Sequence, residues 1–323
     1  MTVLAAAAVM SAGAALVGCA APADLDGERV TSGAPMGVGP ESDEPLPVIV
    51  DTDLGADDLA ALAFLLRHPG VDVRAVTIAA TGLVGCDSGP AVLGGLISAL
   101  EVAAPPVACG RAVAGPGAHP FPSAWRTAAA KGSGVAPEPG AVTTGSDSAV
   151  ELVVRVAQEQ PGVVLLALGP LTNVADVASQ HPQAYRRLTA VHAMAGSVTG
   201  PVTDGVAEWN AAADPEALEM VLAAPAPLTL VPEDAAPLGT PALSTVPVVD
   251  RIFAGAHLPA WWDLATAAAL VSPEAGRAEA ARWMLDPSAP GRLVPQGHGS
   301  VRVVRSLDRA AVEAEYARTF SSG

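Results

Sequence analysis

Short apolar runs alternate along this chain with stretches of helical periodicity, and that alternation limits the folds open to it. The runs are rich in Val, Leu and Ala and too short for helices, which is typical of strands buried inside a sheet. Strands separated by helices pair in parallel, because each crossover returns the chain in the same direction. We therefore expect an α/β fold with a mostly parallel central sheet covered by helices on both faces. The expected strands lie at 48–51, 71–80, 105–109, 162–169, 190–195, 228–231 and 301–304, and the clearest helices at 59–66, 91–100 and 149–158.

The stretch after Cys109 interrupts this alternation. It is rich in Gly and Pro, with His119, Trp125 and Lys131 scattered through it. A long irregular stretch in a compact domain is usually functional, so we expect a loop or lid here.

Four carboxylates, those of Asp51, Asp53, Asp57 and Asp58, crowd one short turn after the first expected strand. The carboxyl ends of strands are where α/β sheets bind ligands. Four like charges cannot all stay ionised in a partly dry pocket without a counter-ion. A ligand set made only of oxygen suits Ca²⁺ or Mg²⁺ rather than zinc. The sequence therefore predicts a divalent metal site in this turn.

A structural role is the alternative for part of this cluster. Acids in the first turn of a helix stabilise its positive end, which would account for Asp57 and Asp58. Helix capping explains one or two acids and leaves Asp51 and Asp53 as ordinary loop residues.

The chain has 323 residues, half of them apolar, so it can bury one large core, and a single catalytic domain is the expected organisation. Its formal net charge of −16 disfavours nucleic acids and anionic membrane surfaces as partners. Small neutral or cationic ligands fit this charge better.

The N-terminal segment is apolar and ends in Leu16-Val17-Gly18-Cys19-Ala20, which resembles the lipobox of a bacterial lipoprotein. We expect residues 1–18 to be a signal peptide, Cys19 to carry a lipid, and residues 19–45 to form a flexible tether before a domain at 46–323. This predicts a lipid anchor at the outer face of the cytoplasmic membrane, or secretion. An uncleaved hydrophobic N-terminus or a wrongly placed start codon is the alternative, because no Lys or Arg precedes the apolar run.

Two further cysteines, Cys86 and Cys109, have no assigned catalytic role. They can pair in an oxidising compartment or stay as buried thiols, and the sequence leaves both open.

Four separated motifs resemble those of the inosine-uridine type nucleoside hydrolases, which split the N-glycosidic bond of ribonucleosides using Ca²⁺. The most specific runs from Asp51 to Asp58, and the others are at 169–173, 207–210 and 262–263. The resemblance extends from about Leu46 to the C-terminus. It implies a Rossmann-like core and N-glycosidase activity on a small-molecule nucleoside, as in purine or pyrimidine salvage, and it leaves a homo-oligomer open.

The resemblance also implies a role for each matching residue. Asp53 resembles the general base, and Asp51 the acid that supports the loop. The implied calcium ligands are Asp53, Asp58, Asp263 and the main-chain carbonyl of Thr172, and the implied substrate-binding residues are Asp57, Glu208, Asn210 and Trp262.

The chemistry of glycosidic cleavage agrees with this set. Departure of the base leaves an oxocarbenium-like sugar, whose positive charge is stabilised by nearby carboxylates. Ca²⁺ polarises water less than zinc does, so a carboxylate such as Asp53 is expected to take the proton from the attacking water.

Three positions depart from the family pattern. Leu83 stands where an Asn is usual, Val202 lies near a second missing Asn, and Trp262 replaces a His that protonates the leaving base in some members. A Trp can stack on a nucleobase but cannot protonate it. His119 and Lys131 in the expected lid are the candidates for that acid, with solvated loop residues as the alternative.

Two other functions fit parts of the sequence. Asp51-Thr52-Asp53 after a strand also suits a haloacid-dehalogenase-like phosphatase, although Gly55 stands where those enzymes usually carry Thr or Val. The departures also fit a surface lipoprotein that binds nucleosides or sugars on a scaffold whose catalysis has decayed. Retention of every implied calcium ligand favours the enzyme.

Overall fold

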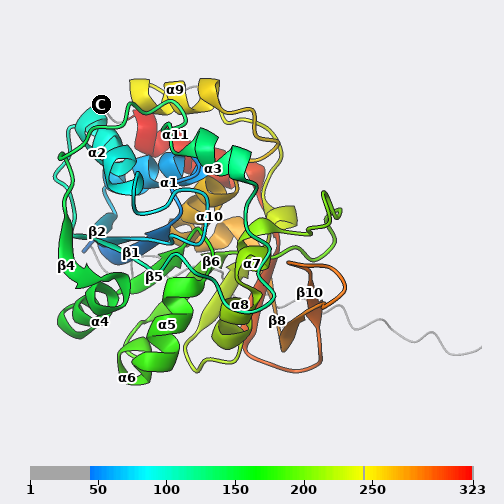
Figure 1. Ribbon diagram of the computed structural model, residues 1–323. Helices are drawn as coiled ribbons and strands as arrows, with labels where there is room; N and C mark the ends of the chain where they lie inside the picture. The colour runs from blue at the N-terminus through cyan, green and yellow to red at the C-terminus, as the bar shows by residue number, and fades with distance from the viewer. Residues whose placement is uncertain (1–43, 243, 322–323) are drawn as a thin grey trace, which may run out of the picture. The chain divides into compact units, whose positions relative to one another are not determined.

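A central sheet dominates the computed structural model, which describes residues 44–242 and 244–321. The sheet has nine strands in the order β4-β3-β2-β1-β5-β6-β7-β11-β8 (Figure 1). Neighbouring strands run parallel throughout, except that β8 is antiparallel to β11. The predicted α/β fold with a mostly parallel sheet is therefore confirmed. The predicted signal peptide, the lipidation of Cys19 and nearly all of the predicted tether lie outside the described residues.

The elements have the following bounds. The strands are β1 (Leu46–Thr52), β2 (Val71–Ile78), β3 (Val107–Cys109), β4 (Thr144–Ser148), β5 (Val164–Ala167), β6 (Ala190–Met194), β7 (Leu228–Val231), β8 (Gly276–Ala281), β9 (Trp283–Leu285), β10 (Leu293–Pro295) and β11 (Val301–Leu307). The helices are α1 (Ala56–Arg67), α2 (Gly89–Leu100), α3 (Ser123–Ala129), α4 (Ala149–Glu159), α5 (Thr172–Gln180), α6 (Pro182–Tyr185), α7 (Trp209–Ala213), α8 (Pro215–Leu222), α9 (Pro247–Gly255), α10 (Trp262–Val271) and α11 (Arg309–Ser321), with short 3₁₀ turns at Glu233–Ala235 and Pro273–Ala275.

Helices cover both faces of the sheet (Figure 1). Helices α1, α2, α9, α10 and α11 pack in one apolar cluster, and α4, α5, α6 and α8 in a second. Val48 and Val50 of β1 belong to the first cluster and Ile49 to the second, because alternate side chains of a strand point to opposite faces. No helix among the described residues combines the length and apolarity needed to cross a bilayer.

The chain turns sharply between β1 and α1. Leu54 adopts a φ of 60°, in the left-handed region that is uncommon for residues other than Gly, while its side chain is fully buried. Helix α1 then begins at Ala56 and carries Asp57 and Asp58 in its first turn. The acids therefore lie where the sequence places them, at the carboxyl end of a central strand.

The stretch between β3 and β4 contains a helix that the sequence analysis did not predict. This helix, α3, and the residues before it contact Trp209 of α7: Phe121 stacks on Trp209 with ring centroids 5.5 Å apart, and Trp125 of α3 meets Trp209 edge-on at 5.1 Å. The predicted loop is thus partly helical, and aromatic side chains pack it against α7.

Candidate active site

Three carboxylates from opposite parts of the chain meet at the carboxyl end of the sheet. Asp57 and Asp58 lie in the first turn of α1 and Asp263 in the first turn of α10, and one oxygen of each lies within 4.8 Å of the other two. Helices α1 and α10 pack together in the same apolar cluster, which brings their first turns side by side. The structure therefore joins the local acidic motif to the distant Asp263, as the resemblance implied.

The Asp58 carboxylate is held by three donors. Thr52 Oγ1 donates to its Oδ1 at 2.5 Å and the Asp53 backbone N–H donates to the same oxygen at 3.1 Å. The Gly55 backbone N–H donates to Oδ2 at 3.1 Å. These bonds fix the direction of both Asp58 oxygens before any ligand binds.

Asp53 adjoins this cluster and is covered by the chain that follows β2. The Leu83 backbone N–H donates to Asp53 Oδ2 at 3.0 Å, and the Gly55 N–H donates to Oδ1 at 3.3 Å. A Cβ on Gly82 would lie 2.2 Å from Asp53 Oδ2, so only glycine fits there. The position where the sequence lacks an expected Asn thus supplies a main-chain donor to the predicted base.

Burial raises the pKa of several of these acids. Burial, reinforced by the neighbouring Asp58 carboxylate, raises the pKa of Asp57 to about 7 and that of Asp53 well above its usual range. Burial and the charges of Asp57 and Asp58 also raise the pKa of Asp263. Each shift reflects a negative charge that lacks a positive neighbour.

A divalent cation fits this environment. The donor set consists of carboxylate oxygens, which Ca²⁺ and Mg²⁺ prefer. Oδ1 of Asp263 is buried without a hydrogen-bond partner, as expected for an oxygen reserved for an ion. The residues that the structure brings together are therefore chemically suited to a metal.

Asp51 is not one of the three clustered carboxylates, and its side chain is hydrogen-bonded to neighbouring elements. It is fully buried, and its Oδ1 accepts hydrogen bonds from Thr77 Oγ1 of β2 at 2.6 Å and Asn173 Nδ2 of α5 at 2.7 Å. Burial outweighs these bonds and raises the pKa of Asp51 to about 7. Through these bonds Asp51 links β1 to β2 and α5.

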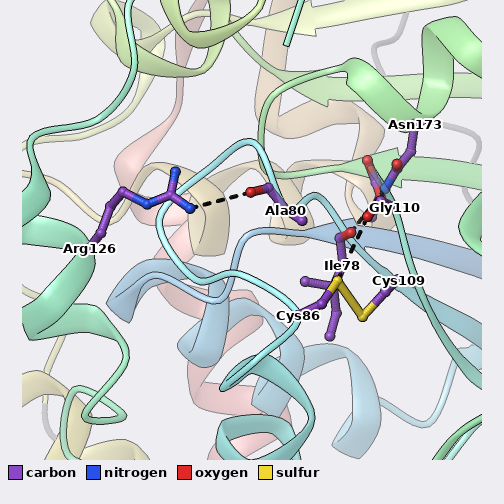
Figure 2. The surroundings of a disulfide bond; sticks show 8 residues. Ile78, Ala80, Cys86, Cys109, Gly110, Arg126 and Asn173 are labelled. Carbon is purple, nitrogen blue, oxygen red and sulfur yellow. Dashed lines mark hydrogen bonds between the residues drawn. A yellow bond between two sulfur atoms is a disulfide. The ribbon is translucent and has the colours of Figure 1, made fainter. Parts of the chain in front are cut away.

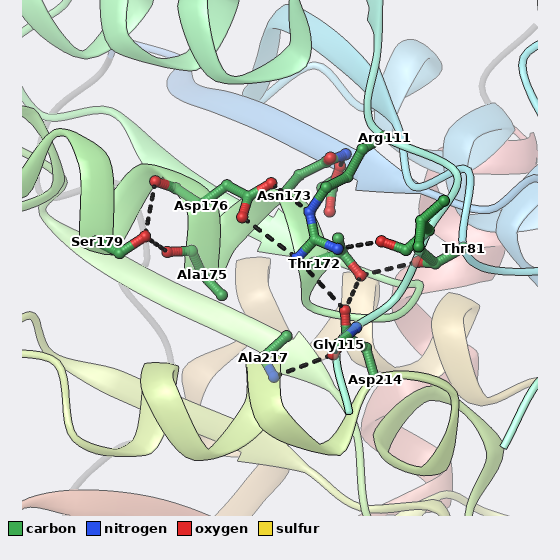
Figure 3. Close-up of polar contacts among 12 residues, drawn as sticks. Thr81, Arg111, Gly115, Thr172, Asn173, Ala175, Asp176, Ser179, Asp214 and Ala217 are labelled. Atoms are coloured by element: carbon green, nitrogen blue, oxygen red, sulfur yellow. Dashed lines mark hydrogen bonds and ion pairs between the residues drawn. The ribbon is translucent and has the colours of Figure 1, made fainter. Parts of the chain in front are cut away.

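Thr172, the predicted carbonyl ligand, is the first residue of α5 and is fully buried. Its Oγ1 donates to Asp214 Oδ2 at 2.7 Å and lies 2.8 Å from Thr81 Oγ1 (Figure 3). Asp214 also caps α8 through the Ala217 N–H and lies 3.8 Å from Arg111. The sequence does not reveal the bond between Asp214 and Thr172, because the two residues belong to different helices.

Glu208 and Asn210, the predicted sugar ligands, are bound to the backbone around them. Glu208 accepts the N–H groups of Asn210 and Ala211 at 2.7 and 2.9 Å, and that of Gly196 at 2.6 Å. Asn210 Nδ2 donates to the carbonyls of Leu168 and Met194 at 2.8 and 3.1 Å. Glu208 thus has a capping role that the sequence analysis did not predict.

Trp262 is half-buried at the start of α10, next to Asp263. His119 and Lys131, the predicted candidates for the leaving-group acid, are exposed. Arg126 of α3 reaches the segment after β2, where it donates to the carbonyls of Ala80 and Thr81 at 3.4 and 3.5 Å. Nothing in the sequence indicates this contact.

Comparisons with known proteins identify the family of this chain. The sequence profile of the inosine-uridine preferring nucleoside hydrolase family matches residues 48–314. Pyrimidine-specific ribonucleoside hydrolase RihA of Citrobacter koseri is 31% identical over 204 residues, covering 57% of this chain and 59% of that protein. The protein of the same name from Enterobacter sp. strain 638 is 34% identical over 188 residues, with the same coverage. The match thus spans less than two thirds of the length of these relatives.

Solved structures share the fold over most of the chain. A nucleoside hydrolase from Bacillus anthracis superposes with a TM-score of 0.69 at 22% identity, covering 86% of this chain and 99% of that one. An inosine-guanosine nucleoside hydrolase gives a TM-score of 0.73 at 20% identity, with 85% and 98% coverage. With the profile match across 48–314, the chain belongs to the inosine-uridine preferring nucleoside hydrolase family.

Proposed function

We propose that this protein hydrolyses the N-glycosidic bond of ribonucleosides to give ribose and a free base. One observation carries the proposal: Asp57 and Asp58 meet Asp263 at the carboxyl end of the sheet, with Asp53 nearby in the same turn, in a chain whose family profile spans 48–314. A phosphatase of the haloacid-dehalogenase type has no support from that family match.

We further propose Ca²⁺ as the cation. Asp58 and Asp263 would bind it, with Asp53 and the Thr172 carbonyl as further ligands, and Asp57 lies in the same cluster. When bound, the ion supplies positive charge that orients a water molecule and sugar hydroxyls and lowers the pKa of that water. The oxygen-only donor set and the buried, unpaired Asp263 Oδ1 support this assignment.

Asp53 is the group that would take a proton from the attacking water. Its two oxygens already accept the N–H groups of Gly55 and Leu83, so the carboxylate is oriented before substrate arrives. A general base held in one direction loses no orientational freedom during the reaction. The concentrated negative charge of the cluster also stabilises the cationic sugar as the base departs.

The remaining residues would hold the sugar and the base. Asp57 and the Oδ1 of Asn210 offer acceptors to ribose hydroxyls, and Glu208 keeps the start of α7 in place through three backbone bonds. Trp262 offers an aromatic face to the base. Because the sequence relatives named above are pyrimidine-specific, uridine and cytidine are the first substrates to test.

The test is a substrate panel of uridine, cytidine, inosine and p-nitrophenyl riboside, assayed for free ribose with and without a calcium chelator. Ribose release that the chelator abolishes and added Ca²⁺ restores is the expected result. Calcium binding without ribose release from any substrate would instead indicate a binding protein with decayed catalysis. Calorimetric titration with Ca²⁺, Mg²⁺ and Zn²⁺ tests the identity of the ion directly.

We also propose an extracytoplasmic location, either at a lipid anchor on Cys19 or after secretion. The support within the described residues is a disulfide between Cys86 and Cys109, since such bonds persist in oxidising compartments. Fractionation of cells, with mass spectrometry of the mature N-terminus, is the test. An unlipidated protein in the cytoplasm would contradict this location.

A further inference from the structure

The disulfide between Cys86 and Cys109 fastens the segment that covers the predicted base. This segment, residues 79–88, joins β2 to α2 and is here named the covering loop. Cys86 lies near its end, and Cys109 is the last residue of β3, with the two Cα atoms 5.9 Å apart (Figure 2). One side of the covering loop is therefore tied covalently to a strand of the sheet.

The covering loop touches Asp53 at three consecutive positions. Gly82 packs so closely against Asp53 that a Cβ there would overlap its carboxylate. The Leu83 N–H donates to Asp53 Oδ2 at 3.0 Å, and the Val84 N–H donates to the Asp53 main-chain carbonyl at 2.9 Å. Both the backbone and the side chain of Asp53 are thus held by this loop.

The other ties of the covering loop are not covalent. Arg126 of α3 reaches the carbonyls of Ala80 and Thr81 at 3.4 and 3.5 Å, which are long hydrogen bonds (Figure 2 shows the contact with Ala80). Thr81 Oγ1 pairs with Thr172 Oγ1 on the side nearest α5. These contacts hold the start of the loop, whereas the disulfide holds its end, two residues beyond Val84.

We propose that the Cys86–Cys109 disulfide is a positioning element for Asp53. It keeps the covering loop closed, so that the Leu83 N–H stays directed at Asp53 Oδ2 and the carboxylate keeps the orientation that a cation and an attacking water require. Opening the disulfide frees the loop, weakens cation binding and slows turnover while the fold persists. The inference rests on the proposed function through the role assigned to Asp53.

The redox step is a thiol–disulfide exchange with a small dithiol such as dithiothreitol. The sulfur–sulfur bond between Cys86 and Cys109 breaks, and each cysteine sulfur gains one electron and one proton. The dithiol loses the same two electrons and two protons and closes into a cyclic disulfide. Because the intact disulfide positions Asp53, the oxidised protein is the fully active form.

The experiment compares oxidised and dithiol-reduced protein by three measurements: deuterium uptake by a peptide that contains Leu83, Ca²⁺ affinity by calorimetry, and ribose release. Reduction should speed amide exchange at Leu83 and weaken Ca²⁺ binding about 10- to 100-fold, the usual effect of losing a group that orients a metal ligand. The far-ultraviolet circular dichroism should stay unchanged. Unchanged exchange and affinity in protein with two free thiols would overturn the inference.

Two matched variants assign the effect to this bond. The double variant Cys86→Ser, Cys109→Ser should behave like reduced wild type and should not respond to dithiol. Cys19→Ser, which keeps the pair, should respond as wild type does. A response of the double variant to dithiol would show that the effect arises elsewhere and would overturn the inference.

A further variant covers the case in which reduction unfolds the protein. Leu83→Pro removes the N–H donor and leaves the disulfide intact. It should weaken Ca²⁺ binding by a similar factor, and an unchanged affinity would overturn the inference. Failure of the oxidised protein to release ribose from any nucleoside would contradict the proposed function alone, because amide exchange and Ca²⁺ affinity still decide the role of the disulfide.

Discussion

Thr172 Oγ1 donates a 2.7 Å hydrogen bond to Asp214 Oδ2, which ties the first turn of α5 to the residue that caps α8. Asp214 is almost completely buried, and its Oδ1 accepts the N–H groups of Ala217 and of Gly115 in the segment after β3 (Figure 3). A single carboxylate therefore connects two helices and the segment that leads into α3.

Two substitutions of Asp214 separate its roles. Asp214→Ala removes the cap and the Thr172 acceptor, and we expect the free energy of unfolding to fall by about 2–4 kcal/mol. Asp214→Asn keeps an oxygen for the Ala217 N–H, so it should cost less stability while still weakening Ca²⁺ binding through Thr172. Denaturant unfolding and calcium titration measure the two effects, and equal stability losses in both variants would contradict this separation.

Neutral isosteres of the predicted base and of one metal ligand should abolish turnover without unfolding the protein. Asp53→Asn removes the proton acceptor, for which a loss of kcat of about 10²- to 10⁴-fold is usual. Asp263→Asn removes a charge from the cation site. Because both changes relieve repulsion among buried carboxylates, the unfolding midpoint in chelator should be equal or higher. A variant that retains wild-type kcat would rule out the role assigned to its residue.

Two glycines of the covering loop offer a matched pair. In Gly82→Ala the new Cβ would lie 2.2 Å from Asp53 Oδ2, so the carboxylate or the loop must move. In Gly85→Ala the nearest atom to the new Cβ is an Arg126 nitrogen 3.8 Å away, which is ordinary contact. We expect a large loss of activity for the first and near-wild-type activity for the second. Similar kinetics for the two variants would argue against a tight fit around Asp53.

The stability of the metal-free protein should depend on pH in the direction set by its buried acids. The pKa values of Asp51 and Asp57 are raised from the ordinary value of 3.8 to about 7, so the folded state binds more protons than the unfolded state between these values. Stability in chelator should therefore fall as the pH rises from about 4 to about 7. Calcium should raise the unfolding midpoint more at pH 8 than at pH 5, and a larger shift at pH 5 would refute this.

Removal of the disulfide should also lower stability, by an amount set by loop length. Cys86 and Cys109 are separated by 23 positions, and closing a loop of this size typically contributes about 2–4 kcal/mol. The double serine variant should lose stability in this range in urea unfolding, with a two-state transition retained. A loss near zero would show that the unfolded chain is already restrained between these positions.

Local sequence signals account for the parts of the fold that were predicted. The buried strand β1 and the acids after it form one continuous pattern, so Asp53, Asp57 and Asp58 could be placed from the residues alone. Strands β4 and β8 could not, because both lie at the edges of the sheet, where β4 is polar and exposed and β8 consists of small and charged residues without an apolar alternation. Helix α3 was hidden in a segment whose Gly and Pro content indicates a loop.

The long-range contacts of the site are what the sequence could not supply. Asp263 was assigned only through family resemblance, since nothing near it in the chain indicates a metal. Two further contacts depend on how separate segments pack. Glu208 accepts the N–H of Gly196, and Arg126 donates to the carbonyls of Ala80 and Thr81. The pairing of Cys86 with Cys109 was left open for the same reason.

The carboxylates that would share an ion are supplied by helices α1 and α10, which are far apart in the sequence. A growing polypeptide on the ribosome therefore exposes its acidic turn long before Asp263 is made. Tight ion capture must wait until α10 has emerged and docked against α1. Tight metal binding would thus occur only after α10 has been synthesised and this domain has folded.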